Sequence, residues 1–404
     1  MGAGTPAFNT HCLWTMNSQN IHQTASADQL KRDSLAIGLL RKRFIQAYLT
    51  WLTGIPHSGQ NFRKRKRLEN LIAAIGALCL GIYATHAALG EGVSIVARTA
   101  LVLLGYSHTL YALRCLRLPN FHYASHYELT RIRSLDHVIG VLIGTVLLIP
   151  PISSYQRQHI EGPGKVHHKW SDLLTPGEDT FEVIKSYGFQ PGAPRRAHWV
   201  RLWLLLANPL FYIDRFAKGI RSAFLSRSTI ENTVSMSTWL CIVMCIAFNH
   251  AWSQFVLIWL VPRVIFFEAA QVFRNLVEHY FPRCAAGKQT PGDFRAMTKA
   301  VFAGEPAPQM DSQDSSITRG LSWCSWSMRM LVVHLPARLW VLTGDTPCHD
   351  LHHVRPGSDW ANHEVERQKL EESGWPLLAN WGMRAAISDF FDTLSNQPDT
   401  LFSK

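Results

Sequence analysis

The sequence predicts an all-α, polytopic membrane protein, in which two transmembrane hairpins carry a cytoplasmic helical cap. Three observations predict this fold. First, long apolar stretches occur in two pairs, and a short turn separates the two members of each pair. Second, Lys and Arg gather at the stretch ends that lie away from these turns. Third, clusters of histidine follow the same ends. The 47% apolar content of the 404 residues is enough for a sizeable core but fixes no function.

The first predicted hairpin covers residues 71–89 and 92–113. The stretch LIAAIGALCLGIYATHAAL is almost free of charge and is long enough for a helix that crosses ~30 Å of hydrocarbon. Only Gly90 and Glu91 separate it from the second stretch, GVSIVARTALVLLGYSHTLYAL. We therefore expect two antiparallel spans.

The second predicted hairpin covers residues 234–267. The segments STWLCIVMCIAF and SQFVLIWLVPRVIFF flank a turn at Asn249 and His250. Pro262 and Arg263 interrupt the second arm. The alternative interpretation is two buried helices of a soluble protein.

Basic residues predict the orientation of these four spans. The run RKRKR at 63–67 precedes the first span, and Arg114 follows the second, while Arg221 and Arg227 precede the third. Because Lys and Arg concentrate on the cytoplasmic side, we expect these ends and both termini to be cytoplasmic. The apolar run 138–150 has the length of a re-entrant or interfacial piece and is not expected to cross.

The chain divides into residues 1–66 and a membrane domain, 67–404. The first part is expected to be a polar tail followed by a basic amphipathic helix that starts at Asp28 as its N-cap. The net charge of +11 agrees with an anionic membrane surface. Nucleic-acid binding would require the same basic residues to be free for phosphate contacts, so no nucleic-acid partner is expected.

Nine of the 19 histidines fall into clusters that follow span ends or lie near the C-terminus, all on the predicted cytoplasmic side. They are His122, His126, His159, His167, His168, His279, His349, His352 and His353. In HDLHH the i, i+3, i+4 spacing presents three imidazoles within about one helical turn. Each cluster alone has a structural alternative, such as an interface or loop histidine; together they indicate metal ligands.

The number of donors suggests two metal ions. A single zinc ion uses three or four ligands, and nine neutral imidazoles exceed that number. Iron is the preferred metal because it can activate dioxygen, whereas zinc has no redox chemistry. Carboxylates at Asp136, Glu278 and Asp350 could accept the second ring N–H of these histidines, although ordinary surface roles are equally consistent with the sequence.

The sequence resembles the membrane fatty acid desaturase and hydroxylase superfamily over about residues 68–370. FHYASHYELTRIRSLDHVIG resembles the first histidine box, YQRQHIEGPGKVHHKW the second and CHDLHHVRP the third. In NLVEHYF, Asn275 stands four residues before His279, as in the Asn-x-x-x-His element of acyl desaturases. The resemblance implies a centre of two iron ions, with Asn275 and Asp136 beside the ligands.

Two features depart from the family pattern. Seven residues separate His159 from His167, where the family has two or three. Either a loop bulges out, or Glu161 or a water replaces His159 as a ligand. The first box has Tyr123 where an acidic residue is common.

The resemblance implies an O2-dependent oxidase that desaturates or hydroxylates an acyl-like or lipid-like substrate. Breaking an unactivated C–H bond requires an oxidant made from O2, which the metal centre would supply. The chain lacks a His-Pro-Gly-Gly haem motif, so electrons are expected from a separate ferredoxin or haem protein. Arg157, Lys165 and Lys169 could receive an acidic head group. The alternative is a non-catalytic membrane protein that binds metal or haem, either an electron carrier or a transporter.

Overall fold

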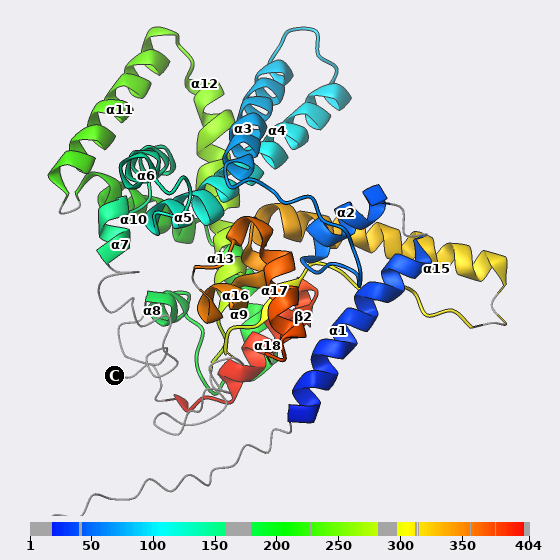
Figure 1. The fold of residues 1–404 in the computed structure, drawn as a ribbon. Coiled ribbons are helices and arrows are strands. Elements are labelled where there is room, and N and C mark those ends of the chain that lie inside the picture. The colour runs from blue at the N-terminus through cyan, green and yellow to red at the C-terminus, as the bar shows by residue number, and fades with distance from the viewer. Residues whose placement is uncertain are drawn as a thin grey trace, which may run out of the picture.

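The computed structural model describes residues 18–39, 43–157, 179–225, 228–281 and 297–399, apart from single positions 312, 314, 356 and 376. The described chain is mostly helical (Figure 1). Its first half contains the helices α1 (Ser18–Gly38), α2 (Arg43–Thr53), α3 (Glu69–Ala88), α4 (Ile95–Cys115), η1 (Leu116–Phe121), α5 (His122–Ser125), α6 (Arg133–Leu147), α7 (Ile152–Gln156), α8 (Asp179–Ser186), α9 (Arg195–Ala207) and α10 (Pro209–Phe224).

The second half contains further helices and one small sheet. The elements are α11 (Thr229–Phe248), α12 (Trp252–Phe255), η5 (Val256–Leu260), η6 (Pro262–Phe266), α13 (Phe267–Glu278), β1 (Ala300–Phe302), α15 (Ser316–Arg329), η7 (Met330–His334), η8 (Ala337–Val341), η9 (Thr346–Cys348), α16 (His349–Val354), η10 (Trp360–Asn362), α17 (His363–Glu372), β2 (Ala379–Trp381) and α18 (Met383–Ser395). β1 and β2 pair in parallel, with Val301 opposite Asn380. The predicted all-α class is confirmed in that the described chain is mostly helical. The small sheet was not predicted, because three-residue strands carry no recognisable alternation of apolar and polar residues.

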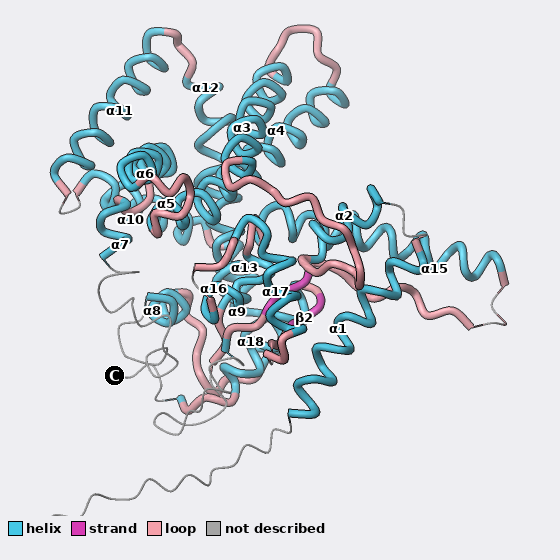
Figure 2. The backbone as a smooth tube through the Cα atoms, viewed as in Figure 1, coloured by secondary structure: helices cyan, strands magenta, loops and turns pink. Residues whose placement is uncertain are grey.

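Three helices of the described chain are long and apolar enough to cross a membrane: α3, α11 and the continuous helix Trp252–Glu278. They agree with three of the four predicted spans. The fourth, α4, has 21 residues but carries Arg98, His108 and Arg114, and it is not among the three. Figure 2 shows both hairpins extending in the same direction, away from the part of the molecule that carries α16.

Close packing joins α3 to α4. A Cβ atom on Gly81 would overlap Thr109 Oγ1, and one on Gly105 would overlap Thr85 Oγ1. Small residues at matching heights let two backbones approach closely, which is how membrane helices associate without a hydrophobic driving force. The first hairpin is thus held by glycine contacts rather than by interlocking large side chains.

The second hairpin turns where the sequence predicts. Asn249 and His250 follow the end of α11, and His250 has a positive φ of 51°. The following helix passes through Pro262 without a break, by means of the π-helical segments η5 and η6. A π-helical turn accommodates the missing N–H of proline. The predicted interruption at Pro262 is therefore a local change of helical winding.

The helix α6 is the predicted short apolar piece. It has 15 residues, and its C-terminus is capped by Leu148 in the left-handed conformation with φ 48°. Arg263, which is 1% exposed, donates to the carbonyl of Leu147 at 2.6 Å and to that of Leu148 at 3.3 Å. At 1.5 Å per residue α6 is about 22 Å long, shorter than the hydrocarbon layer.

The N-terminal helix begins at Ser18. The prediction that Asp28 is its N-cap is therefore wrong. Asp28 is buried, and its Oδ1 accepts from Trp381 Nε1 at 2.8 Å. The helix ends at Gly38, where a side chain would collide with Trp323, so the single predicted helix is two helices. Asp28 thus forms a tertiary contact with Trp381, far along the chain, instead of capping a helix. The boundary predicted at residue 66 stays a prediction.

Candidate metal centre

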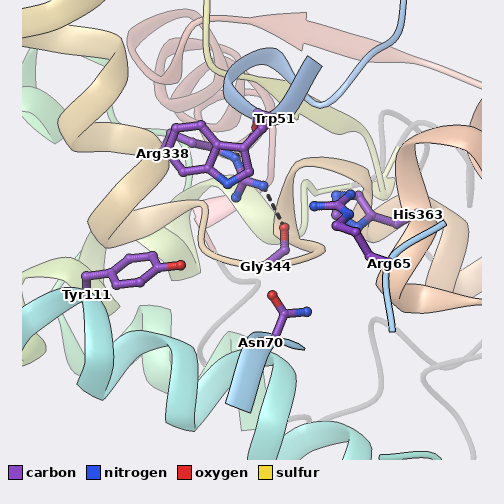
Figure 3. A pocket seen from close by; sticks show the side chains of 7 residues that line it. All are labelled: Trp51, Arg65, Asn70, Tyr111, Arg338, Gly344 and His363. Carbon is purple, nitrogen blue, oxygen red and sulfur yellow. Dashed lines mark hydrogen bonds between the residues drawn. The ribbon is translucent and has the colours of Figure 1, made fainter. Parts of the chain in front are cut away.

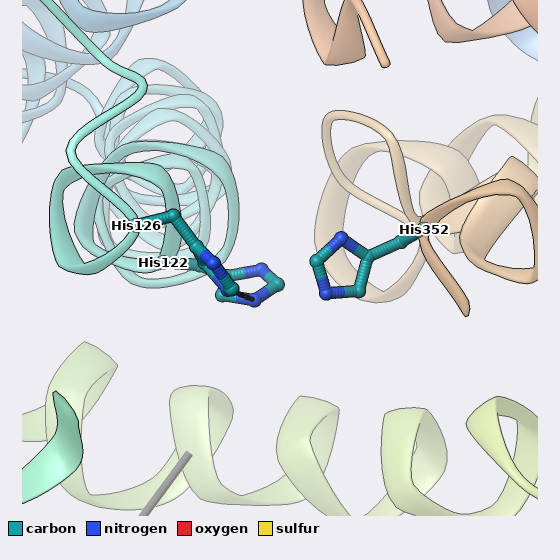
Figure 4. Close-up of side chains that lie close together, drawn as sticks. All are labelled: His122, His126 and His352. Carbon is teal, nitrogen blue, oxygen red and sulfur yellow. Dashed lines mark hydrogen bonds between the residues drawn. The ribbon is translucent and has the colours of Figure 1, made fainter. Parts of the chain in front are cut away.

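Three histidines form a first group where α5 meets α16. His122 and His126 lie one helical turn apart, and their Nε2 atoms are 3.1 Å from each other. His352 faces them from α16, with ring centroids at 4.8 Å from His122 and 5.2 Å from His126 (Figure 4). All three ligand atoms lie within 4.8 Å of one another. We call these residues the first triad.

A second triad forms where α13 meets α16. His279 caps the C-terminus of α13, and its ring lies 5.3 Å from that of His349 and 4.9 Å from that of His353. The Nε2 atoms of His349 and His353 are 2.9 Å apart. These three ligand atoms also lie within 4.8 Å of one another.

The short helix α16 connects the two triads because its spacing divides the rings. His349 and His353, at i and i+4, turn to α13, whereas His352 turns to α5. The ring of His352 lies 5.8 Å from each of the other two. The sequence HDLHH thus serves two adjacent three-nitrogen sites at once.

The separations between nitrogens fit metal coordination. Two imidazole nitrogens at about 2.1 Å from one ion and at right angles to each other are about 3.0 Å apart. The observed Nε2 separations of 3.1 Å and 2.9 Å agree with this value. Five of the six rings are buried and His126 is partly buried, so the nitrogens are withdrawn from bulk water.

The site favours neutral imidazole. Burial, together with the neighbouring rings of His353, His279 and His352, lowers the pKa of His349 well below its ordinary value. Neutral imidazole is the form that binds a metal ion. Both the geometry and the charge state of the rings therefore suit divalent cations.

A family model of fatty acid desaturases matches residues 94–381, which is more than half of the chain. The chain belongs to the fatty acid desaturase family. No curated protein and no solved structure matches it. The matched range overlaps most of the range over which the sequence resembles this superfamily, and it contains both triads of this desaturase-family protein.

Three of the nine predicted ligands lie outside the described residues. They are His159, His167 and His168, the second histidine box of this desaturase-family chain. The other six are the two triads. The alternatives for the long second box, a bulged loop or replacement of His159, therefore stay open.

Glu278 lies beside the second triad, and its carboxylate contacts one of the ring nitrogens. Its Oε1 lies 3.0 Å from His349 Nε2, the nitrogen that also faces His353. The sequence suggested Glu278 as one possible acceptor for a second ring N–H, with a surface role equally open; in the structure its carboxylate lies at the ring nitrogen that faces the other rings of the second triad. It also pairs with Arg274, one turn earlier on α13. Its carboxylate is therefore a candidate ligand.

The other predicted neighbours of the histidines have partners elsewhere in the described chain. Asp350 receives two hydrogen bonds from Arg367 Nε, at 2.9 and 3.2 Å, which fix α16 against α17. Asp136 accepts from the backbone and hydroxyl of Thr130, at 2.8 and 2.5 Å. A direct role of these two carboxylates toward ring nitrogens stays a prediction.

Asn275 lies in the wall of a large cavity. Its Oδ1 accepts from Gln271 at 2.7 Å, and its Nδ2 donates to the hydroxyl of Tyr187 at 2.9 Å. The sequence placed Asn275 close to His279, and both line this cavity. Its polar atoms are engaged by neighbours, which holds the side chain in one orientation.

The structure adds a support that the sequence did not predict. The hydroxyl of Tyr123 donates to Asp345 at 2.5 Å, and the ring stacks on Trp360 at 4.2 Å between centroids. Burial raises the pKa of Asp345 to about 6 and that of Tyr123 well above its ordinary value. Tyr123 and Asp345 are 222 positions apart, and no sequence motif links them. The sequence therefore showed that Tyr123 is unusual in the first box but did not indicate its partner.

The cavity beside the triads measures about 590 Å³. Histidines of both triads form part of its lining, namely His122, His279, His349, His352 and His353. Leu148, Ile149 and Phe267 supply apolar surface, and a group of cationic side chains supplies charge. This desaturase-family protein thus has a space for a ligand in direct contact with its candidate metal ligands.

A second pocket is separate from the metal ligands. It measures only about 10 Å³ and lies between Trp51, Arg65, Asn70, Tyr111, Arg338, Gly344 and His363 (Figure 3). This volume is about that of one water molecule. The pocket is too small for a substrate, so the large cavity is the relevant one.

Proposed function

We propose that this protein is an O2-dependent, di-iron membrane oxidase that desaturates or hydroxylates an acyl-like or lipid-like substrate. The observation that carries the proposal is the meeting of two histidine triads on the two sides of α16. Membership of the desaturase family supports a membrane oxidase of this type. Two three-nitrogen sites with adjacent rings favour two ions over one.

The first ion would be held by the first triad and the second ion by the second triad, with Glu278 as a further oxygen donor. His159, His167 and His168 are proposed as additional ligands. Bound iron would supply the one-electron chemistry with O2 that removal of a hydrogen atom from an unactivated carbon requires. A carboxylate and neutral imidazoles suit such a metal.

The chain's own residues would bind and orient the substrate. The 590 Å³ cavity brings apolar surface from Leu148, Ile149 and Phe267 up to the histidines. A hydrocarbon chain placed there is held close to the site, and water is displaced from it. Orientation by the cavity then decides which C–H bond is presented to the metal centre.

The membrane arrangement is also part of the proposal. Four spans with cytoplasmic termini would put the histidines on the cytoplasmic side, within reach of a separate ferredoxin or haem protein that supplies electrons. The three apolar helices support membrane insertion. Desaturation and hydroxylation share the first hydrogen abstraction, so both outcomes are compatible with the site.

Metal analysis of the purified full-length protein tests the proposal. We expect about two iron atoms per chain and no haem absorbance. His352→Ala and His353→Ala each remove one imidazole from a different triad, so each variant should lose iron, while His250→Ala at the hairpin turn should not. Haem in the wild-type protein, or no iron, would contradict the proposal and favour a non-catalytic carrier or transporter.

The second box gives an independent test. His168→Ala is expected to abolish iron loading, whereas partial deletion of residues 161–165 should be tolerated if that segment is only a loop. Normal iron content in His168→Ala would exclude this residue as a ligand. Mass analysis of products, with reductant and O2 present, then separates loss of two hydrogens from gain of one oxygen.

A further inference from the structure

Cationic side chains outnumber carboxylates around the large cavity. Arg117, Arg215, Arg263 and Arg274 line it, and the buried Arg114 stands directly behind its wall, where it donates to Gln271 at 2.7 Å. Their charges are close enough that Arg117 and Arg274 repel each other, as do Arg263 and Arg117. We call these five residues the arginine cluster.

Only two carboxylates offset this cluster among the described residues. Glu268 pairs with Arg263 at 2.7 Å and also with Arg215 at 3.5 Å, so one carboxylate serves two guanidinium groups. Glu278 pairs with Arg274. Lys218 and Glu182 also line the cavity, but their side chains are more than half exposed and are therefore largely solvated.

Two arginines form no direct ion pair with a carboxylate in the described part of the chain, and Glu278 acts on both only from a distance. Arg114 donates to the carbonyl of Trp340 and to Gln271, which are both neutral. Arg117 lies over the rings of Phe121 and Tyr155, at 5.1 and 5.0 Å. Arg114 is buried and Arg117 is half-buried. A charge withdrawn from water without a paired carboxylate is costly. Two metal ions would add more positive charge to the same cavity than the single carboxylate of Glu278 could offset.

An anion in the cavity would resolve this imbalance. The planar guanidinium group matches carboxylate and phosphate oxygens, and the hydrogen bonds that it forms with them are stronger than those between neutral groups. The low polarity of a partly enclosed site strengthens this attraction. The apolar lining beside the cluster accepts a hydrocarbon chain in the same space.

We propose that the cavity contains an oxyanion subsite, in which Arg117 and Arg215 hold the carboxylate or phosphate head group of an anionic amphiphile. The proposal rests on the proposed oxidase function and specifies its substrate class. It excludes a neutral lipid such as an alkane, an alcohol or an uncharged ester as the preferred ligand. Arg215 contributes because the one carboxylate that it pairs with among the described residues, that of Glu268, is shared with Arg263.

Equilibrium dialysis of the full-length protein in an uncharged detergent tests this subsite. The labelled probes are dodecanoate, dodecyl phosphate and dodecanol, which share one chain length and differ in the head group. Arg117→Gln and Arg215→Gln are compared with Arg133→Gln. The control is matched, because Arg133 also lies over an aromatic ring, that of Tyr127 at 5.4 Å, but does not line the cavity.

We expect at least one anion to bind about tenfold or more tightly than dodecanol, and to lose about tenfold in affinity in the cavity variants, with no loss in the control. The anion that binds more tightly shows whether the subsite prefers a carboxylate or a phosphate head group. A loss of anion affinity in only one variant assigns the contact to the arginine replaced in that variant. If Arg117→Gln is not recovered folded, Arg215→Gln alone decides.

Two results would overturn the subsite: equal binding of dodecanol and both anions, or wild-type anion binding in every folded cavity variant. Iron content is measured on the same samples. An iron-containing protein without anion preference loses only the subsite, whereas a protein without iron loses the proposed function whatever it binds.

Discussion

Tyr123 ties the first triad to a carboxylate far along the chain. It stands between His122 and His126 on the segment that presents both rings, and its hydroxyl donates to buried Asp345. The ring also stacks on Trp360, so two independent contacts fix this segment. The tyrosine that departs from the family pattern therefore has a structural partner.

Replacing Tyr123 with Phe should destabilise the protein. The variant keeps the stacked ring but leaves the buried Asp345 without its hydroxyl donor, which typically costs about 1–3 kcal/mol. Thermal unfolding in detergent should show a lower midpoint. Tyr127→Phe is the control, since no hydrogen bond of the Tyr127 hydroxyl occurs among the described residues; equal midpoints for both variants would argue against the Tyr123 contact.

His363 gives the stability a pH dependence. Burial lowers the pKa of this ring to about 4, and its Nδ1 lies 3.0 Å from the carbonyl of Trp360. The unfolded chain binds a proton near pH 6.5, whereas the folded chain stays neutral. The unfolded state therefore binds more protons between these values, and stability falls as pH decreases from about 6.5 to about 4.

The pH effect is measurable as a difference between variants. The fall in melting temperature between pH 7 and pH 5 should be smaller for His363→Gln than for the wild type, because glutamine does not titrate. His250→Gln, at an exposed position, is the control. An identical fall in all three proteins would show that His363 contributes nothing to the acid sensitivity.

At the scale of elements, α16 and its supports decide the geometry of the site. α16 has six residues, too few for an isolated helix to be stable in water. Arg367 of α17 holds it through Asp350, and Glu278 of α13 contacts it at His349. The two triads thus depend on contacts between elements rather than on helix propensity.

The α3–α4 contact offers the clearest prediction at this scale. Gly81→Ala should destabilise the protein by about 1–3 kcal/mol, because the added methyl group would overlap Thr109 and must push α4 away. Gly76→Ala on the same helix is the matched control, since a Cβ at Gly76 has nothing within 4 Å. Thermal unfolding in detergent measures both; similar midpoints would mean that the hairpin is loosely packed.

At the scale of the whole molecule, both hairpins extend away from the part that carries α16 (Figure 1). This arrangement is consistent with hairpin turns on one membrane side and histidines on the other. Exposed apolar residues such as Ile72, Ile75, Leu240 and Val243 cover the outward faces of α3 and α11. Lipid chains are the natural cover for such surfaces.

Cysteine accessibility tests the topology. In a variant that lacks native cysteines, single cysteines at Glu91 and at Ser253 near the two turns should react with an impermeant maleimide from the outside of intact cells. A cysteine at the exposed Glu372 should react only after the membrane is opened. In the four-span topology three crossings separate Glu91 from Glu372, so labelling of both cysteines from the same side would contradict that topology.

The sequence alone determined the features that depend on local pattern. Apolar stretches of sufficient length indicated three helices that are able to span a membrane, the turn at Asn249 and His250 was placed correctly, and the spacing of HDLHH indicated candidate metal ligands. Each of these signals comes from side chains close together in the chain, where hydrophobicity and helical periodicity act directly. The family match over residues 94–381 agrees with this part of the prediction.

Only the tertiary structure decided how those residues combine. The division of HDLHH between two triads, the partnership of Tyr123 with Asp345, the burial of Asp28 against Trp381 and the arginine cluster all join segments far apart in the chain. Their energies arise when distant groups are brought together and removed from water, and no local pattern encodes which groups will meet.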